Sequence, residues 1–512
     1  MAASQVGAAS SAKGSEWFRL LPWSAALISA AAYAPILGSY FLHDDFNHLY
    51  NIANKGFWHF VLTPHGGHAH CTRNVVFYSF YRFFGLDPRP YFASALLTHA
   101  LNVYLLCRII ELLTEDSRLA FVGGVLWGTC RANEQTIGWY SVYGQALATL
   151  LTLWVLFDLL RSGRTRISMA RIVGWCALQL VSLTCFGTGI GTALAFPVMV
   201  FLLLAGSPQR SRATLMTASL FVTVPALYFA LVNLYATLYG QGGPVDATIL
   251  RPHNFDQLVG VLKMLATLIQ YGIADLFLSL YATEGARELP LAGHVVGAVS
   301  IAAIVMTFAF GTTVTRRRIA AFGVAFLATY GIIAFGRAVP VLVFFGRSFA
   351  WGAAEPRYHY TTVALFSVIL CLTLHEARRV PALRRIPLRL LLLAFAATNP
   401  LLRLPPGGVI DQHVGARSAT IGVLNAVDAA VRSAPPGQTV LINNRAFAWR
   451  SILVPPEGFP GWAAVFMIAH SDNVLNGHPV RFVEHDPKVL EALRAQGGRV
   501  ATLIVGPGEP ST

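Results

Sequence analysis

The sequence contains few charged residues. Asp, Glu, Lys and Arg make up 12% of the 512 residues, whereas hydrophobic residues make up 55%. Because soluble domains usually carry about 25% charged residues, this composition excludes a soluble enzyme. The chain also lacks the ten-residue alternation that is typical of a membrane β-barrel. Apolar runs of about 20 residues recur instead, and they predict a polytopic α-helical membrane protein.

Cysteine is scarce as well, and the six cysteines form no CxxC pair and no zinc-binding spacing. Most of them fall inside apolar runs, where cysteine acts as a small hydrophobic side chain. Cys71 and Cys130 are both expected near the outer face, so a disulfide between them stays open. No repeat of about 34 residues is present, which argues against tetratricopeptide repeats.

Positive charge is abundant, with a formal net charge of +14. The arginines form short clusters between apolar runs instead of one basic face, so we expect no nucleic-acid partner. Loops rich in Lys and Arg usually stay in the cytoplasm. The clusters at 161–171, 210–212, 316–318 and 378–389 fall on one side of the membrane if the spans below are correct. We therefore expect a multi-pass protein of the cell (inner) membrane with a cytoplasmic amino terminus.

The apolar runs predict about eleven transmembrane helices. The first is expected to be an uncleaved signal anchor, because no small-residue cleavage site precedes the acidic pair at its end. The predicted spans are 20–41, 90–112, 118–134, 143–160, 171–187, 189–206, 213–235, 290–312, 319–337, 358–376 and 386–402.

Two further regions are predicted to lie outside the membrane core. Residues 255–285 are apolar but contain four charged side chains, and a span there would place the 316–318 arginines outside. We expect interfacial helices in this region. The breaker cluster at 405–408 separates a transmembrane domain, 1–403, from a small α/β domain, 404–512, on the extracytoplasmic (periplasmic) side. Helices near 416–433 and 487–496 and strands at 439–443 and 499–505 are expected in this domain.

An acidic pair stands at the start of the first extracytoplasmic loop, 42–89. Asp44 and Asp45 follow His43 where the first span meets the outer surface. Carboxylates at membrane depth are costly and are usually functional. The alternative is that one of them, Asp45, caps the helix expected at 46–54. Asp44 is then the expected reactive group.

Polar residues follow the acidic pair in a characteristic order. The order is Arg73, Gly85-Leu86-Asp87-Pro88 with Tyr91, a span with His99 and Asn102, and then Arg131, Asn133, Glu134, Trp139 and Tyr140. This pattern resembles the membrane module of the GT-C superfamily of polyprenyl-phosphate-sugar glycosyltransferases. It is most similar to the protein O-mannosyltransferase and aminoarabinose-transferase branch and to TMTC-type mannosyltransferases. The resemblance covers roughly residues 20–205, and the absence of tetratricopeptide repeats puts a protein acceptor in doubt.

The resemblance implies roles for several residues. The acidic pair, Asp44 and Asp45, would supply the catalytic carboxylate, and an Arg-Tyr pair, Arg357 and Tyr358, would lie near the lipid phosphate. Glu134, Trp139 and Tyr140 would line a sugar cavity, although an interfacial aromatic belt explains the rings equally well. Glu355 and His43 are assigned to the same cavity by their positions beside these residues.

The chemistry of sugar transfer from a lipid phosphate supports this choice. The acceptor hydroxyl needs a general base, which a carboxylate can provide. The departing phosphate needs cations, and the planar fork of arginine binds two phosphate oxygens at once. For Arg357, an interfacial anchor is the alternative. Arg357 and Arg73 are the first candidates, with Tyr358 and Arg347 next, and Arg131 and Arg337 are also expected on the outer side.

The segment 65–71 contains three histidines and a cysteine. It matches no structural zinc spacing. Three interpretations stay open: a metal site, hydrogen bonding to the acceptor or phosphate, and a solvated loop. We assign His70 to the acceptor and sugar cavity. We predict no metal and no cofactor. A divalent cation that bridges Asp44 or Asp45 to phosphate stays open as an alternative without direct support.

These observations predict an inverting membrane glycosyltransferase. It would take a sugar from a polyprenyl-phosphate carrier and transfer it to an extracytoplasmic acceptor, which is a glycan, lipid or protein. A transporter or lipid flippase is the first rival, but such proteins tend to show internal repeats and broken helices. A polysaccharide polymerase or ligase is the second rival, and only the family resemblance argues against it.

Overall fold

The computed structural model describes most of the membrane part of the chain. The described residues are 19–41, 44–65, 68–163, 167–239, 254–278, 288–344, 346–379, Arg417, 439–443, 474–475, 478–483 and 500–504. Several predicted features lie outside this set. They are His43, the span at 386–402, the helix near 487–496 and, except for Arg417, the helix near 416–433. The boundary proposed at residue 404 also lies outside it.

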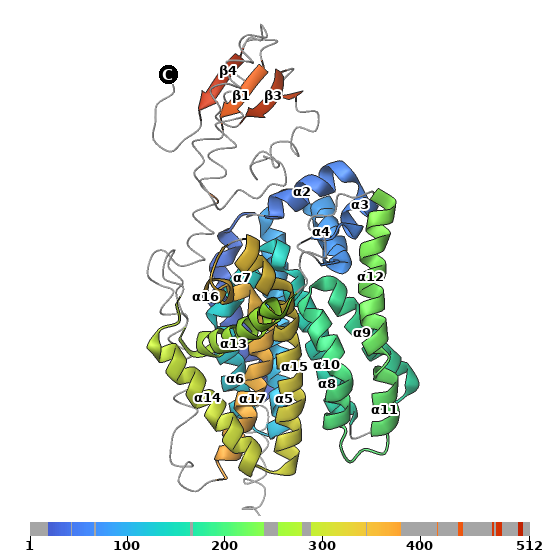
Figure 1. Cartoon of the computed structure of the whole chain (residues 1–512), viewed down its shortest axis with the longest axis vertical. Coiled ribbons are helices and arrows are strands. Elements are labelled where there is room, and N and C mark those ends of the chain that lie inside the picture. Colours follow the sequence, from blue (N-terminus) through green and yellow to red (C-terminus); the bar gives the residue numbers. More distant parts are fainter. Residues whose placement is uncertain are drawn as a thin grey trace, which may run out of the picture.

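Long helices run side by side and form a bundle (Figure 1). Eight of the described helices are long and apolar enough to cross a membrane. Two shorter apolar helices, α9 (Met169–Cys185) and α10 (Thr188–Leu203), lie among them. The eight are Arg19–Gly38 with η1 (Ala34–Gly38), α5 (Pro88–Thr114), Tyr140–Ser162 with α8 (Gly144–Ser162), Arg210–Tyr239 with α11 (Arg210–Thr217) and α12 (Leu220–Tyr239), α13 (Phe255–Leu278), α14 (Leu291–Phe310), Thr313–Val343 with α15 (Thr313–Val339) and η4 (Pro340–Phe344), and α17 (Tyr360–Ala377).

The α-helical membrane architecture agrees with the sequence prediction, except that one predicted helix is shorter than expected. Seven of the eight helices coincide with predicted spans, and α9 and α10 occupy two more. The predicted span at 118–134 is instead α6 (Ser117–Gly128), followed by a short 3-10 turn, η2 (Arg131–Asn133), and α7 (Glu134–Gly138). A helix of 12 residues reaches only about 18 Å, which is shorter than the hydrocarbon core.

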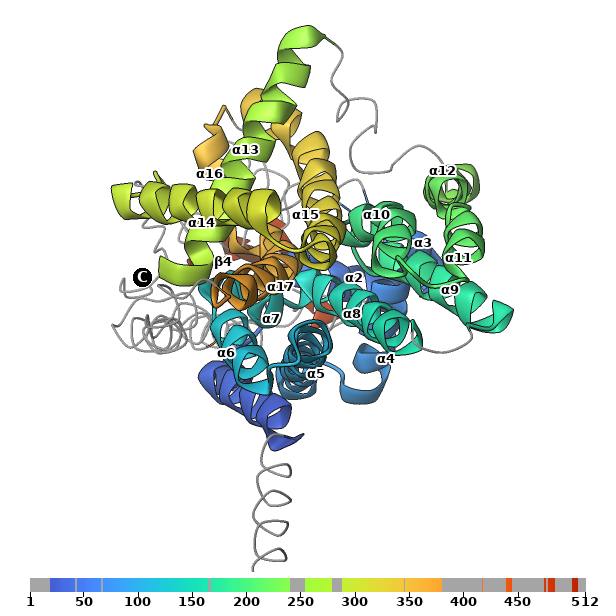
Figure 2. The ribbon, with the colours of Figure 1, turned by 90° about the horizontal axis from the view of Figure 1, so that it is seen from below.

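Helix α13 is the eighth long helix, and its sequence was expected to lie at the membrane interface. Figure 1 shows it crossing the bundle near α7 and α16 (Phe349–Ala353), and Figure 2 shows it extended across the bundle. Phe255, Leu258 and Leu262 form an exposed apolar stripe on its first half. This orientation supports an interfacial helix, although the length and composition of α13 also fit a span.

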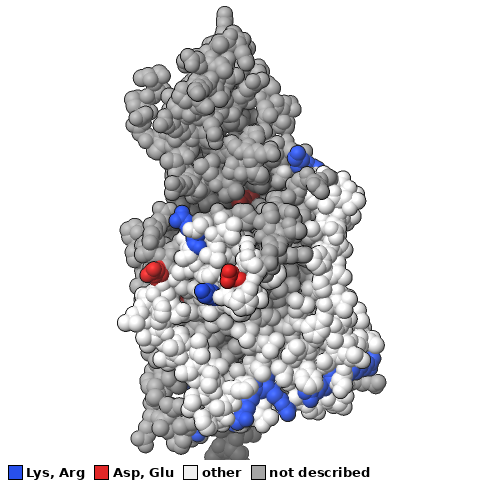
Figure 3. All heavy atoms as spheres, viewed as in Figure 1, with Lys and Arg blue, Asp and Glu red and all other residues white. Residues whose placement is uncertain are grey.

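Charge separates the two ends of the bundle. On the face shown in Figure 3, Lys and Arg gather at the lower rim, and an uncharged band separates them from mixed charges above. The ends of α11, α14 and α15 lie at this lower rim in Figure 1. The helices α2 (Asp44–Lys55), α3 (Phe57–Leu62) and α4 (Cys71–Phe84) lie at the opposite end. The arrangement is that of a membrane protein with its basic loops on one side.

We expect this charge asymmetry to set the orientation in the membrane. A reporter that is active only outside the cytoplasm should be active when fused after Lys55 and inactive when fused after Ser162. The two positions lie at the end of α2 and the end of α8, respectively. The same activity at both positions would contradict the predicted topology.

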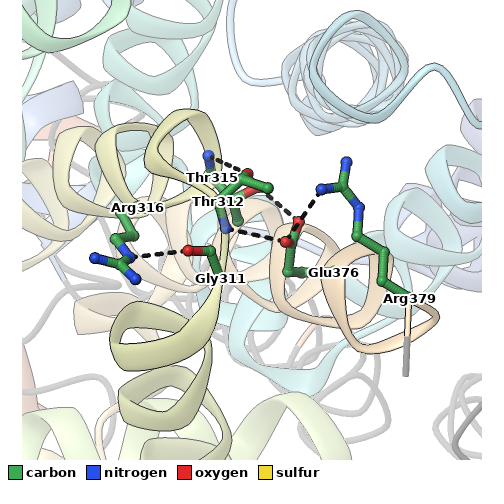
Figure 4. Close-up of polar contacts among 6 residues, drawn as sticks. All are labelled: Gly311, Thr312, Thr315, Arg316, Glu376 and Arg379. Carbon is green, nitrogen blue, oxygen red and sulfur yellow. Dashed lines mark hydrogen bonds and ion pairs between the residues drawn. The ribbon is translucent and has the colours of Figure 1, made fainter. Parts of the chain in front are cut away.

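A buried carboxylate joins helices at the lower end of the bundle. Glu376 on α17 accepts hydrogen bonds from the Thr312 amide at 3.0 Å, the Thr315 hydroxyl at 2.8 Å and Arg379 at 3.3 Å (Figure 4). Nearby, Arg316 donates to the Gly311 carbonyl at 2.9 Å. The carboxylate therefore connects the end of α17 to the turn between α14 and α15.

Replacing Glu376 by Gln should destabilise the protein, because hydrogen bonds to a charged group contribute about 1.5 to 3 kcal/mol. The apparent Tm in detergent should fall. Arg379→Gln is the matched control, since Arg379 is 56% exposed and surface pairs contribute little. Equal Tm values for the two variants would show that Glu376 is not a structural link.

A small sheet forms in the carboxyl-terminal region. Its strand order is β2-β3-β1-β4, and β1 pairs in parallel with β3 and β4. The observed strands β1 and β4 coincide with the two predicted strands. The strands are β1 (Thr439–Asn443), β2 (Val474–Leu475), β3 (His478–Val483) and β4 (Val500–Ile504).

Candidate functional site

The acidic pair lies in the first turn of α2. Free backbone N–H groups and the helix dipole favour negative charge at this position. The two carboxylates differ in burial: the Asp44 side chain is 22% exposed, whereas Asp45 is fully buried. Asp44 is therefore the carboxylate that a bound substrate can reach more easily.

Asp45 links α2 to a distant segment of the chain. Its Oδ1 accepts hydrogen bonds from the backbone N–H and the hydroxyl of Ser141, both at 2.5 Å. Ser141 belongs to η3 (Tyr140–Val142), which precedes α8. The neighbouring Tyr140 ring packs edge-on against Phe77 of α4 at 4.9 Å between centroids. These contacts give Asp45 a structural partner that sequence inspection did not indicate.

Arg73 lies on α4 at the same site and is fully buried. Among the described residues, none of its three guanidinium nitrogens has a hydrogen-bond partner. Burial lowers the pKa of Arg73 to about 10, and the carboxylates of Asp45 and Asp44 counteract this effect. The guanidinium therefore stays charged near neutral pH, with unused donors close to an acidic pair.

The approach of Arg73 to α8 depends on a glycine. A Cβ atom at Gly144 would lie 2.9 Å from the Arg73 Cγ and 2.2 Å from the Cys185 carbonyl oxygen. Contacts that close are not tolerated, so only glycine lets α4 and α8 pack at this distance. Gly144 thus helps to hold the charge of Arg73 inside the protein.

Arg357 lies in η5 (Pro356–Tyr358), a short turn before α17. Its guanidinium pairs with Glu355 at 3.2 Å and lies over the Trp139 ring, 5.0 Å from the centroid. The side chain is thus fixed by a carboxylate on one side and by an aromatic face on the other.

The charge of Arg357 is favoured by its surroundings. Burial opposes this charge, but Glu355, Tyr358 and Asp44 more than compensate and raise the pKa of Arg357. Asp44 also favours the charged form of Arg73. One carboxylate therefore acts on both arginines.

Arg337 is a third cation at this site, and sequence inspection counted it only among several outer arginines. It lies near the end of α15, and its guanidinium is 5.9 Å from the centroid of the Tyr358 ring. Its charge also lowers the pKa of His68 in the first loop. The two residues are far apart in the sequence, so no local pattern could place Arg337 here.

The histidines of the first loop are buried or half-buried beside these arginines. Burial lowers the pKa of His68 to about 3, with Arg337 and His65 adding to the effect. Burial and Arg73 lower the pKa of His48 and of His70 well below the usual value. These three rings are thus neutral at pH 7 and can bind polar groups without adding charge.

The depressed pKa values predict acid sensitivity. Below about pH 6.5 the unfolded chain binds protons at these histidines and the folded protein does not. The stabilisation is complete above that pH and should be lost as the pH falls toward 3. The apparent Tm should therefore decrease between pH 7 and pH 4, and His68→Gln should reduce the slope. The same slope in both proteins would contradict this explanation.

Two acidic residues assigned to the sugar cavity from the sequence, Glu134 and Glu355, are buried in the structure. Gln135 connects the segments that carry them by donating to the Glu355 carboxylate at 3.4 Å. The Tyr140 ring is also buried and stacks on the Tyr143 ring at 4.9 Å between centroids. These residues lie in the interior of the protein, and their assignment to a sugar cavity stays a prediction.

Two residues of the predicted binding set differ in their placement. The His70 ring is buried and stacks on the Phe186 ring, with 5.1 Å between centroids. Arg347 is exposed, and its guanidinium lies 5.9 Å from the centroid of the Trp351 ring. His70 therefore belongs to the interior of the loop, whereas Arg347 is the predicted phosphate ligand that the described contacts tie least to the site.

No group of three or more His, Cys, Asp or Glu side chains in the described part of the chain is arranged to hold a metal ion. None of the six cysteines, Cys71 and Cys130 among them, forms a disulfide in the structure. The disulfide left open by the sequence is therefore not formed. The site consists of carboxylates, arginines, neutral histidines and aromatic rings.

Comparison with known proteins identifies the fold. No family model and no curated protein matches the sequence. Among solved structures, the chain is similar to ArnT from Cupriavidus metallidurans bound to undecaprenyl phosphate, with a TM-score of 0.50 and 12% sequence identity. The match covers 95% of this chain and 89% of that one. The likeness confirms the polytopic helical membrane fold predicted from the sequence.

Proposed function

We propose that this chain, which has the fold of ArnT, is a membrane glycosyltransferase that uses a polyprenyl-phosphate-sugar donor. The observation that carries the proposal is the arrangement of charge around Asp44. One partly accessible carboxylate acts on two guanidiniums, those of Arg73 and Arg357. A base beside phosphate-binding cations is what sugar transfer from a lipid phosphate requires.

The proposed reaction is a single displacement. Asp44 removes the proton from an acceptor hydroxyl while the acceptor oxygen bonds to the anomeric carbon of the sugar. The bond between that carbon and the phosphate oxygen breaks, and the phosphate departs with the electron pair. Because no covalent sugar intermediate forms, the configuration at the anomeric carbon inverts, as it does in inverting glycosidases.

Arg73 is the strongest candidate for the phosphate ligand. A buried guanidinium without hydrogen bonds is unfavourable, and an anion between its donors would remove the penalty. Arg357 already pairs with Glu355 and stacks on Trp139, so it brings a positioned charge with fewer unused donors. Arg337 adds a third positive charge to the site.

The ArnT structure contains undecaprenyl phosphate, which supports a polyprenyl-phosphate carrier as the donor here. Undecaprenyl phosphate supports the identity of the carrier, whereas the sugar and the acceptor require a transfer assay. The orientation with α2 and α4 on the extracytoplasmic side follows from the basic lower rim and is part of the proposal.

The test is an assay of membranes that contain the protein with a panel of radiolabelled polyprenyl-phosphate sugars. We expect label to move from one of these donors to a membrane or envelope acceptor. The transfer should require the intact Asp44 side chain. If no donor in the panel supports transfer above that of membranes lacking the protein, the proposed function is wrong.

A further inference from the structure

His65 lies against the proposed base, Asp44. Its Nε2 atom is 3.1 Å from the Asp44 Oδ2 atom. The His65 ring packs edge-on against the His48 ring, with 4.6 Å between centroids. The side chain is therefore held between the carboxylate on one side and a buried neutral ring on the other.

The backbone fixes His65 as firmly as its ring contacts do. The His65 amide donates to the His68 carbonyl at 2.9 Å, and the His68 amide donates to the His65 carbonyl at 3.1 Å. This reciprocal pair is an isolated antiparallel bridge. The His68 ring rests on Gly187, where an added Cβ would lie 2.7 Å from that ring. His68 therefore cannot shift without disturbing a close contact.

Building on the proposed function, we propose that His65 is a positioning residue that orients the Asp44 carboxylate by donating an Nε2–H hydrogen bond to Oδ2. The hydrogen bond restricts rotation of the carboxylate and so holds the proposed base in one orientation. A donated hydrogen bond also favours the ionised carboxylate, which is the form that can accept a proton. His65 itself does not contact the reacting atoms in this scheme.

The position of the donor nitrogen makes the proposal specific. The side-chain amide nitrogen of Gln can take nearly the place of a histidine Nε2, whereas Asn is one methylene shorter. His65→Gln should therefore preserve the hydrogen bond to Asp44, and His65→Asn and His65→Ala should lose it. If His65 only filled space, the activity of the three variants would not follow their ability to donate a hydrogen bond to Asp44.

Other charged and titratable groups surround the pair and must be held constant. All of them remain in the three His65 variants, so a difference between Gln and Asn cannot come from them. They are Asp45 and His48 on α2, His68 and His70 in the loop, Arg73 on α4, Tyr140 on η3 and Arg357 in η5.

The kinetic test compares wild type, His65→Gln, His65→Asn and His65→Ala in the transfer assay. We expect kcat to fall about tenfold or more in the Asn and Ala variants, with little change in KM for the donor, and to be largely retained in the Gln variant. The acidic limb of the pH profile of kcat/KM should move to higher pH in the Ala variant and return in the Gln variant. Equal kcat values and pH profiles in all four proteins would overturn the proposal.

A measurement without substrate separates this proposal from the proposed function. In a double-mutant cycle of Asp44→Ala and His65→Ala, the Tm changes should not add, because each single substitution breaks the same contact. Additive changes would overturn the pairing of His65 with Asp44. Absence of transfer in wild type with non-additive Tm changes would instead contradict the glycosyltransferase proposal and leave the pairing supported.

Discussion

Asp44→Asn should lower sugar transfer by at least about a hundredfold, the lower range for the loss of a general base. The amide has nearly the same shape as the carboxylate but cannot accept the proton of the acceptor hydroxyl. Membrane insertion and protein abundance should stay normal, since Asp44 is partly exposed at the start of α2. The measurement is the initial rate of label transfer per amount of membrane protein.

Asp87→Asn is the matched control for this substitution. Asp87 belongs to the same first loop, caps α5 through the Arg89 amide, and is 39% exposed. Its replacement should leave the transfer rate nearly unchanged and cost about 1 kcal/mol of stability at most. Near-normal transfer by Asp44→Asn would remove Asp44 as the base. A loss of the same size in both variants would indicate a general disturbance of the loop.

Arg73→Lys should have the second largest effect, a decrease in kcat of about a hundredfold. Lysine keeps the positive charge but does not reproduce the planar fork that can bind two phosphate oxygens. Because the interaction is proposed to strengthen as the phosphate departs, the loss should appear in kcat more than in KM for the acceptor. The assay is the same transfer reaction over a range of acceptor concentrations at a fixed donor concentration.

Two further substitutions are needed to interpret the result for Arg73→Lys. Arg89→Lys is the control, since Arg89 is 70% exposed and paired with Asp87 outside the site. Arg357→Lys tests the interfacial-anchor alternative, because lysine can also reach the headgroups. Full activity of Arg357→Lys would support an anchor. Full activity of Arg73→Lys would show that the phosphate is bound elsewhere, and Arg337 would be the next candidate.

Hydropathy was sufficient to predict most of the membrane helices, because a span must be apolar over about 20 residues wherever its neighbours lie. The helix predicted at 118–134 ends earlier than expected, because the apolar run continues past the end of α6 into turns buried inside the protein. Apolar character reports burial and does not distinguish burial in lipid from burial in protein. Helix α13 is the reverse case, because it is long and apolar enough to span a membrane but extends across the bundle.

The acidic pair and Arg357 were chosen as candidates from the sequence, since charges beside apolar runs are unusual. The partners of these residues could not be identified in this way. Ser141 is 96 positions from Asp45, and Gln135 is 220 positions from Glu355. Such contacts depend on how helices pack, and a single sequence contains no local signal for them. His65 was noticed only as a member of a histidine-rich string.

The segment 139–141 has a consequence for protein engineering. Ser141 holds Asp45 beside the proposed base, while the Trp139 ring lies against the guanidinium of Arg357. Three consecutive residues thus connect the acidic pair of α2 to the guanidinium of Arg357. A chimera that exchanges the loop 44–65 to change the acceptor would need to exchange residues 139–141 with it. Otherwise the new loop would pack against a segment that does not match it, and the arginine beside that segment would move as well.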